Sequence, residues 1–248
     1  MEKYKVSSAG NNELFLITDC YKKLCQIMKS LKNDRGKIVH VIGAPGTGKS
    51  ANIYHAIGDL NLNIYDMKLR LKSVNISSKQ VFNTMFEGLN EDLEVKSKEE
   101  IYRKLSEYDA VLIADSFHDS HNLDPTYIGF SKWTYYSGFK ALHFYLLCIA
   151  EYLRHRKYFK NINIILQTAW RIHILGKKYD LFSDLGLFSK ILVNILNIFF
   201  DVVLICYSEK ETIEIVKMHV EDADTDTVRE YIQKYGHKPR FICDALKK

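Results

Sequence analysis

Apolar runs along the chain predict the strands of a parallel sheet. Residues 37–42, 110–114, 161–166 and 201–207 are rich in Val, Ile and Leu, which is typical of strands that helices bury on both faces. The stretch 60–65 alternates apolar and polar residues and predicts one further strand. Between these runs apolar residues recur every three or four positions, which predicts helices. The alternation of strands and helices predicts an α/β fold, a three-layer and mostly parallel sheet.

The C-terminal third shows a different pattern. Two β-branched runs, 201–207 and 212–218, flank the polar tetrapeptide 208–211, and this arrangement predicts a C-terminal β-hairpin. Residues 179–199 read as mostly helical, and a short helical tail follows the hairpin. We therefore expect an N-terminal helical segment over 1–36, a core over 37–220, and a small C-terminal helical tail or lid over 221–248.

One motif stands between the first predicted strand and the helix after it. The sequence matches G-x-x-x-x-G-K-[ST], whose glycines let backbone N–H groups converge on phosphate at a helix N-terminus. The lysine is then expected to meet the β- and γ-phosphates of ATP, and the serine hydroxyl to bind Mg²⁺. The expected nucleotide-binding residues are Gly43, Ala44, Pro45, Gly46, Thr47, Gly48, Lys49, Ser50 and Ala51.

Polar side chains follow several of the predicted strands. Asp115 follows 110–114, and we expect it to hold Mg²⁺ together with Ser50. Gln167 follows 161–166 and is expected to sense the γ-phosphate or orient water, because ligands collect at the carboxyl ends of parallel strands. Asp66 follows 60–65; as a catalytic base or as the cap of a turn it is equally well explained. Arg171 is a candidate for reaching a neighbouring subunit's nucleotide, or a residue of a solvated turn.

Composition and charge narrow the setting only slightly. A net charge of +5 permits nucleic-acid contact without requiring it. The basic segment 154–160 fits a helix C-terminus or, alternatively, a contact with phosphate backbone. Five cysteines without C-x-x-C spacing predict reduced thiols, and polar residues interrupt the apolar stretch 187–207. We expect a cytoplasmic protein with no membrane segment, in the host cytoplasm if it is viral.

These residues together resemble the additional-strand branch of phosphate-loop ATPases. The 110–116 strand end, Gln167 and a hairpin from Asp201 look like the RecA and KaiC group. The helix before the first strand, the wording of the loop and the segment 236–240 are similar to AAA+ proteins, including initiator-like ATPases of archaeal viruses and plasmids, and there Arg240 resembles the arginine that reports nucleotide state from a lid. AAA+ proteins usually carry glutamate where this chain has Ser116.

The resemblance implies a Mg²⁺-dependent ATPase that works or assembles on nucleic acid, as a homo-oligomer with nucleotide at subunit edges. Its catalytic residues are expected to be Lys49, Asp115, Asp66 and Gln167. Two other functions share the phosphate loop: a nucleoside or small-molecule kinase, and a nucleotide-binding switch that does not hydrolyse ATP. Replication, packaging and recombination all remain open as processes.

Overall fold

The computed structural model describes residues 14–67, 76–108, 110–114, 137–174 and 177–247. For residues 137–142, 171, 173–174 and 177–178 it describes the backbone alone. Asp115 and Ser116 lie outside the described residues, so nothing is said of their structure. No helix of the described segments is long and apolar enough to cross a membrane.

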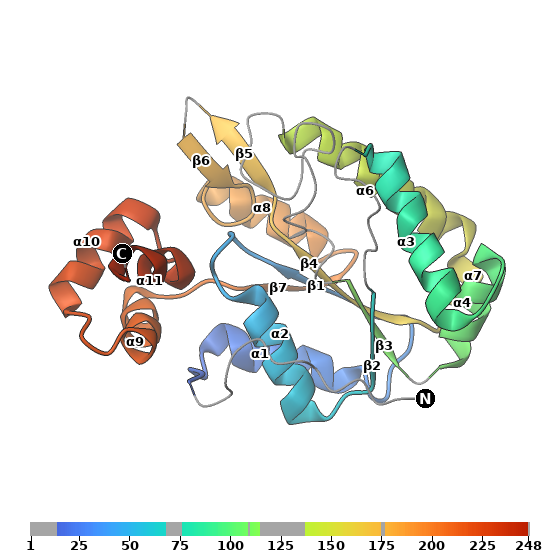
Figure 1. Ribbon diagram of the computed structural model, residues 1–248, viewed down its shortest axis with the longest axis horizontal. Helices are drawn as coiled ribbons and strands as arrows, with labels where there is room; N and C mark the ends of the chain where they lie inside the picture. The colour runs from blue at the N-terminus through green and yellow to red at the C-terminus, as the bar shows by residue number, and fades with distance from the viewer. Residues whose placement is uncertain (1–13, 68–75, 109, 115–136, 175–176, 248) are drawn as a thin grey trace.

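A five-stranded sheet lies at the centre of the chain (Figure 1), and every described pairing in it is parallel. Its strand order is β2-β3-β4-β1-β7. The strands are β1 (Ile38–Ile42), β2 (Ile64–Asp66), β3 (Val111–Ala114), β4 (Asn163–Thr168) and β7 (Asp201–Leu204). The predicted α/β fold with a mostly parallel sheet is confirmed, and β4 is the strand inserted between the strand of the phosphate motif and β3.

Helices cover both faces of this sheet, which makes three layers (Figure 1). One face carries α1 (Asp19–Ser30) and α2 (Lys49–Leu60), packed on alternate residues of β1, β3 and β7. The other carries a larger group packed on β3 and β4. This group contains α3 (Ser78–Leu93), α4 (Lys98–Glu107), α6 (Ser137–Arg154) and α7 (Arg156–Phe159). Near β1 and β7 the same face is covered by α8 (Leu187–Leu196).

An antiparallel hairpin that the sequence did not predict follows β4. Its strands are β5 (Arg171–Ile174) and β6 (Lys177–Asp180), with Arg171 paired to Asp180. The mostly helical prediction for 179–199 is therefore wrong at its start, where β6 and a turn precede α8. Phe182 in that turn packs against Ile42 of β1 and Val202 of β7. This contact holds the end of the hairpin against the strand that leads into the phosphate motif.

The predicted C-terminal β-hairpin is wrong, because residues 209–219 form α9 (Glu209–His219). Ser208 caps this helix, and Glu211 reaches back to the Ser208 backbone N–H at 2.8 Å, a capping box that the sequence contains as S-x-x-E. With α10 (Thr225–Tyr235) and α11 (Pro239–Leu246), α9 buries a small core of its own around Val216, Val228 and Ile242. Figure 1 shows this α9–α11 unit beyond the end of β7.

Candidate nucleotide-binding site

The phosphate motif forms the loop between β1 and α2, as predicted. Gly43 has φ of +151°, and a Cβ there would lie 2.7 Å from the carbonyl oxygen of Ile205. Gly46 has φ of +85°, a conformation that other residues rarely adopt. Thr47 closes the loop by donating its hydroxyl to the Ala44 carbonyl at 2.9 Å. The backbone thus makes a cradle that side chains would obstruct, and the residues present fit a phosphate group.

Lys49 begins α2 and is only 6% exposed. Its Nζ donates to the carbonyl oxygens of Gly43 and Ala44, both at 3.0 Å. The lysine side chain therefore folds back over its own loop and holds its charge at the mouth of the cradle. A buried ammonium beside a helix N-terminus attracts an anion strongly, because little water screens it.

Ser50 and Gln167 meet across the sheet edge. The Ser50 hydroxyl donates to Oε1 of Gln167 at 3.1 Å, and the Gln167 side chain is buried. Gln167 sits opposite Val41 in the β1–β4 register, so β4 delivers it directly beside the loop. The next residue, Thr168, contacts His40 at 2.8 Å between Oγ1 and Nε2. The structure thus brings together Ser50 and Gln167, which the sequence proposed as a metal ligand and a phosphate sensor.

Asp66 and Asp115 are placed less directly. Asp66 ends β2, where its Oδ2 accepts from the Tyr54 hydroxyl of α2 at 3.4 Å. Two strands lie between β2 and β1, which at about 4.8 Å per strand separates them by roughly 14 Å. The role of Asp66 as catalytic base stays a prediction. Asp115 follows β3, whose last residue Ala114 pairs with Leu166, but its side chain lies outside the described residues.

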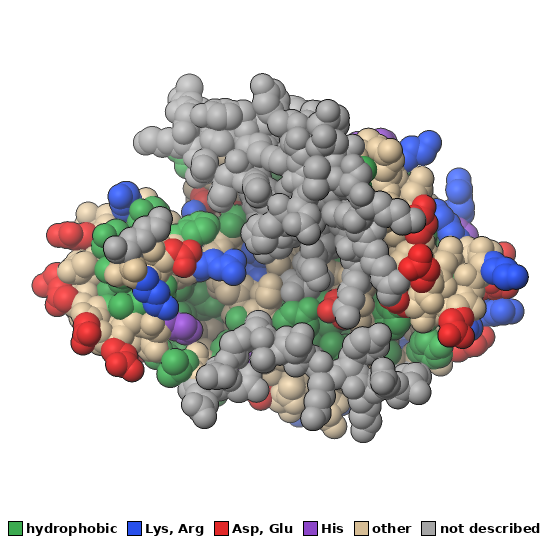
Figure 2. All heavy atoms as spheres, viewed as in Figure 1, with side chains coloured by type: hydrophobic (Ala, Val, Ile, Leu, Met, Phe, Trp, Pro, Cys, Tyr) green, Lys and Arg blue, Asp and Glu red, His purple; other side chains and the backbone are tan. Residues whose placement is uncertain are grey.

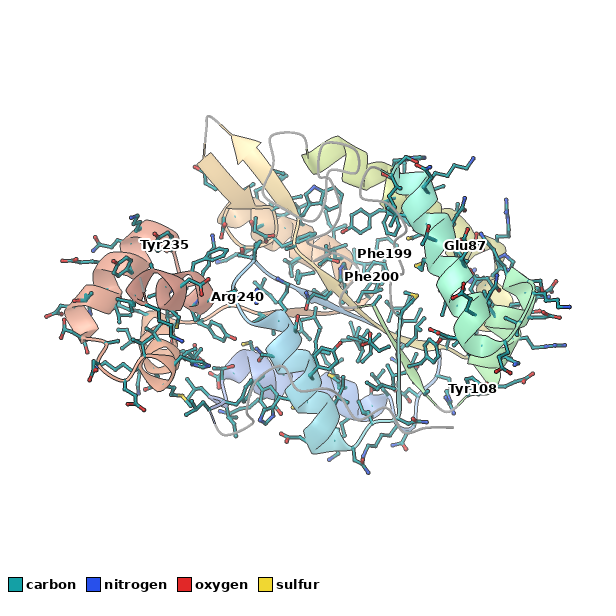
Figure 3. All side chains as sticks on the ribbon, viewed as in Figure 1. Glu87, Tyr108, Phe199, Phe200, Tyr235 and Arg240 are labelled. Carbon is teal, nitrogen blue, oxygen red and sulfur yellow. The ribbon has the colours of Figure 1, made fainter. Side chains whose placement is uncertain are left out.

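The α9–α11 unit reaches the loop through the start of α11. The backbone N–H of Arg240 donates to the Gly46 carbonyl at 3.2 Å, and the ring of Phe241 lies 3.3 Å from where a Gly46 Cβ would stand. The Arg240 side chain is exposed and lies on the side of the unit that faces the sheet (Figure 3). The segment 236–240, noted in the sequence for its likeness to a lid, thus contacts the phosphate loop.

Asp180, Asp184 and Lys238 form a charged group beside the loop that the sequence did not reveal. Asp180 is fully buried, and burial raises its pKa to about 6, although the nearby Lys49 charge lowers it. Asp184 accepts from the Asp180 backbone N–H, and from Lys238 Nζ at 2.9 Å. These residues carry no local motif, because a hairpin and a distant helix bring them together. Among the described residues no group of three or more His, Cys, Asp or Glu side chains is arranged to hold a metal ion.

The strand order, the loop and the buried lysine together define the fold of a phosphate-loop ATPase with an additional strand, as the sequence resemblance implied. No protein-family model matches the sequence. No curated protein is significantly similar to it.

Three solved structures resemble the chain, and all are described as replication initiation proteins. They are Cdc6p from Pyrobaculum aerophilum (12% identity, TM-score 0.49, 96% of this chain covered), a DNA replication initiation factor (15%, 0.44, 97%), and the replication initiator DnaA bound to AMPPCP and single-stranded DNA (14%, 0.44, 97%). This chain spans 63–65% of the length of those chains. At such identities and TM-scores, the fold class rests on the strand order of the chain itself.

Proposed function

We propose that this protein binds ATP with Mg²⁺ and hydrolyses it. The observation that carries this proposal is the Lys49 ammonium, buried over a glycine cradle with the Ser50–Gln167 pair beside it. The loop amides and Lys49 would bind the β- and γ-phosphates, and Ser50 with Asp115 would hold Mg²⁺. The metal would neutralise phosphate charge during transfer. ATP is the nucleotide that the resemblance implies.

Within this site we assign each residue one task. Lys49 stabilises the charge that develops on the transferring phosphoryl group. Gln167, held by Ser50 at 3.1 Å, senses the γ-phosphate or orients water. Asp66 is the proposed base, and its place at the sheet edge makes this the weakest assignment. Slow intrinsic hydrolysis is expected, because Ser116 stands where AAA+ proteins usually carry glutamate.

The α9–α11 unit favours the AAA+ resemblance over the RecA-like one. The RecA-like reading relied on a hairpin after Asp201, and that segment continues into α9 instead. We infer that the α9–α11 unit acts as a lid whose Arg240 reports which nucleotide is bound. The contact between the Arg240 backbone and Gly46 supports this role. We also propose a homo-oligomer with nucleotide at subunit edges, as in the initiator-like ATPases that the sequence resembles.

Nucleic acid is the proposed macromolecular partner. In Figure 2 acidic side chains gather along the outer edge of the α9–α11 unit, where Asp222, Asp224, Asp226 and Glu230 are exposed. That edge would repel phosphate backbone. Arg154, Arg156 and Lys160, at the far end of the molecule, are exposed, and we propose that they contact nucleic acid.

The nucleotide site is tested by thermal melting with and without ATP and Mg²⁺. At a concentration of 100 times Kd, ATP should stabilise the wild type by about 2.7 kcal/mol and Lys49→Ala hardly at all. Lys22→Ala is the matched control, because Lys22 is an exposed lysine on α1. Equal stabilisation of wild type and Lys49→Ala would show that the site assignment is wrong.

The reaction and partner are tested by measuring ATP turnover with no DNA, with single-stranded DNA and with double-stranded DNA at one stated salt concentration. Phosphate release stimulated several-fold by DNA supports the proposal. Transfer of phosphate to a nucleoside would identify a kinase, and unchanged ATP despite tight binding would identify a switch. Replacing Arg154, Arg156 and Lys160 by Ala should reduce the stimulation, whereas replacing Lys210, Lys234 and Lys247, which are exposed on the lid, should not.

A further inference from the structure

Asp180 is a buried carboxylate of which only one oxygen is hydrogen-bonded. Its Oδ1 accepts from the Phe182 backbone N–H and from the Ser183 hydroxyl, both at 3.1 Å. Its Oδ2 has no hydrogen-bond partner among the described residues, and the side chain is 0% exposed. A buried ionised oxygen without a partner is costly. Such a group is stable only if a nearby cation compensates its charge or if it binds a proton.

The fold places this carboxylate next to the phosphate-loop lysine. Phe182, two residues after Asp180, packs against Ile42 at the end of β1. Lys49 Nζ bonds to the carbonyl of Gly43, the residue after Ile42. Asp180 and Lys49 thus approach the same point from β6 and from α2.

Electrostatics agrees with this placement. Burial, the largest effect, raises the pKa of Asp180, the Lys49 charge lowers it, and the Asp184 charge raises it, with about 6 as the result. Lys238 is held by Asp184 at 2.9 Å, and Arg171 is the backbone partner of Asp180 in the hairpin. The carboxylate therefore depends on Lys49 for compensation of its negative charge.

We propose that Asp180 is a counter-ion of Lys49 in the nucleotide-free protein and takes up one proton when phosphates become the partners of Lys49. The incoming phosphates draw the ammonium away and add negative charge nearby, and both changes favour the neutral acid. The proton comes from solvent: carboxylate, proton and nucleotide give a complex with a neutral carboxyl group at position 180. This inference rests on the proposed function, since it requires a nucleotide in the loop.

Nucleotide affinity should then depend on pH with a definite sign. Below about pH 6 the free protein already carries the proton, so binding takes up none. Above that pH, and up to the higher pKa of the bound state, Kd should rise by up to about tenfold per pH unit. Asp180→Asn should remove this dependence. Its amide keeps the Oδ1 contacts and remains neutral at every pH.

The test is isothermal titration of a non-hydrolysable ATP analogue with Mg²⁺, at pH 7 to 8, in two buffers of different ionisation enthalpy. Wild type should take up close to one proton more than Asp180→Asn, and at pH 8 the variant should bind at least about tenfold more tightly. Because both proteins receive the same ligand, the titration of the ligand cancels. Asp184→Asn is the matched control: it removes a neighbouring carboxylate and the bond to Lys238, but it should keep the proton uptake.

Two results would overturn the inference alone: wild type that binds the analogue with no more proton uptake than Asp180→Asn, or a variant with the wild-type pH dependence. Should Asp180→Asn fail to fold, the pH dependence of Kd in the wild type decides, since a Kd that does not rise above pH 6 contradicts the proposal. Failure of the wild type to bind the analogue at any pH would overturn the proposed function as well.

Discussion

Two buried carboxylates, in two regions of the molecule, are treated very differently by their surroundings. Glu151 lies between α4, α6 and α7 and is 8% exposed. It accepts from the Tyr102 hydroxyl at 2.9 Å and from Lys98 Nζ at 3.5 Å, and His155 Nε2 lies 3.4 Å away. Asp180, by contrast, is 0% exposed and has one oxygen that no described group bonds. The first carboxylate is satisfied by its neighbours, and the second is left ready to change its protonation state.

The difference separates a stabilising cluster from a responsive one. The groups around Glu151 stay together whether or not a ligand binds, since each has its partner inside the helical layer. The cation near Asp180 is the lysine that we propose binds phosphate, so its partner is expected to change. Burial without full hydrogen bonding is costly to folding and is typical of functional sites.

The largest effect is expected in the satisfied cluster. Glu151→Ala should reduce the free energy of unfolding by about 3 to 5 kcal/mol, because it leaves a buried Tyr102 hydroxyl and the Lys98 ammonium without their acceptor. Glu151→Gln, which keeps an acceptor for Tyr102, should lose only about 1 kcal/mol. Urea unfolding at pH 7 measures both. Equal losses for Ala and Gln would mean that charge, not hydrogen bonding, stabilises this cluster.

The opposite sign is expected at Asp180. Its folded-state pKa of about 6 exceeds the ordinary value of 3.8, so the folded protein binds the proton more tightly than the unfolded chain. Stability from this group is therefore present below pH 4 and is lost as pH rises to 6. Asp180→Asn should be more stable than wild type by about 2 to 3 kcal/mol at pH 8 and no more stable at pH 4.

His40 contributes a slope of the other sign over the same range. Burial lowers its pKa from 6.5 to about 4, so its stability contribution is lost as pH falls from 6.5 to 4. The two groups offset each other in the wild type, and Asp180→Asn should therefore lose stability on acidification more steeply than wild type. Thermal melting between pH 4 and pH 8 measures this, and parallel curves for the two proteins would contradict the assignment of the slope to Asp180.

The smallest effect is expected at the contact between loop and lid. Gly46→Ala forces a side chain into a left-handed conformation and places its Cβ 3.3 Å from Phe241, which should cost about 1 to 2 kcal/mol and weaken nucleotide binding. Gly58→Ala is the control, because Gly58 lies in α2 with nothing within 4 Å of an added Cβ. It should gain about 0.5 to 1 kcal/mol in urea unfolding. Equal behaviour of the two variants would separate Phe241 from the nucleotide site.

Sequence reasoning worked where the determinants are close together in the chain. The predicted strand, loop and helix around Lys49 are confirmed, because the apolar run of β1 and the glycines of the loop act within a dozen residues. It failed at 212–218, where β-branched composition suggested a strand. The capping box of Ser208 and Glu211 was the local signal for α9, and the burial of Thr212 and Val216 one turn apart completed the helix.

The sequence by itself determined the phosphate loop, the buried strands and the polar residues that follow them, since local backbone preference and apolar patterning suffice for these. Only the tertiary structure decided that Gln167 meets Ser50, and that Asp180, Asp184 and Lys238 gather beside the loop. Those meetings depend on strand order, on an unpredicted hairpin and on a helix 54 residues beyond Asp184. Such contacts arise from long-range burial of apolar faces, which no short stretch of the chain encodes.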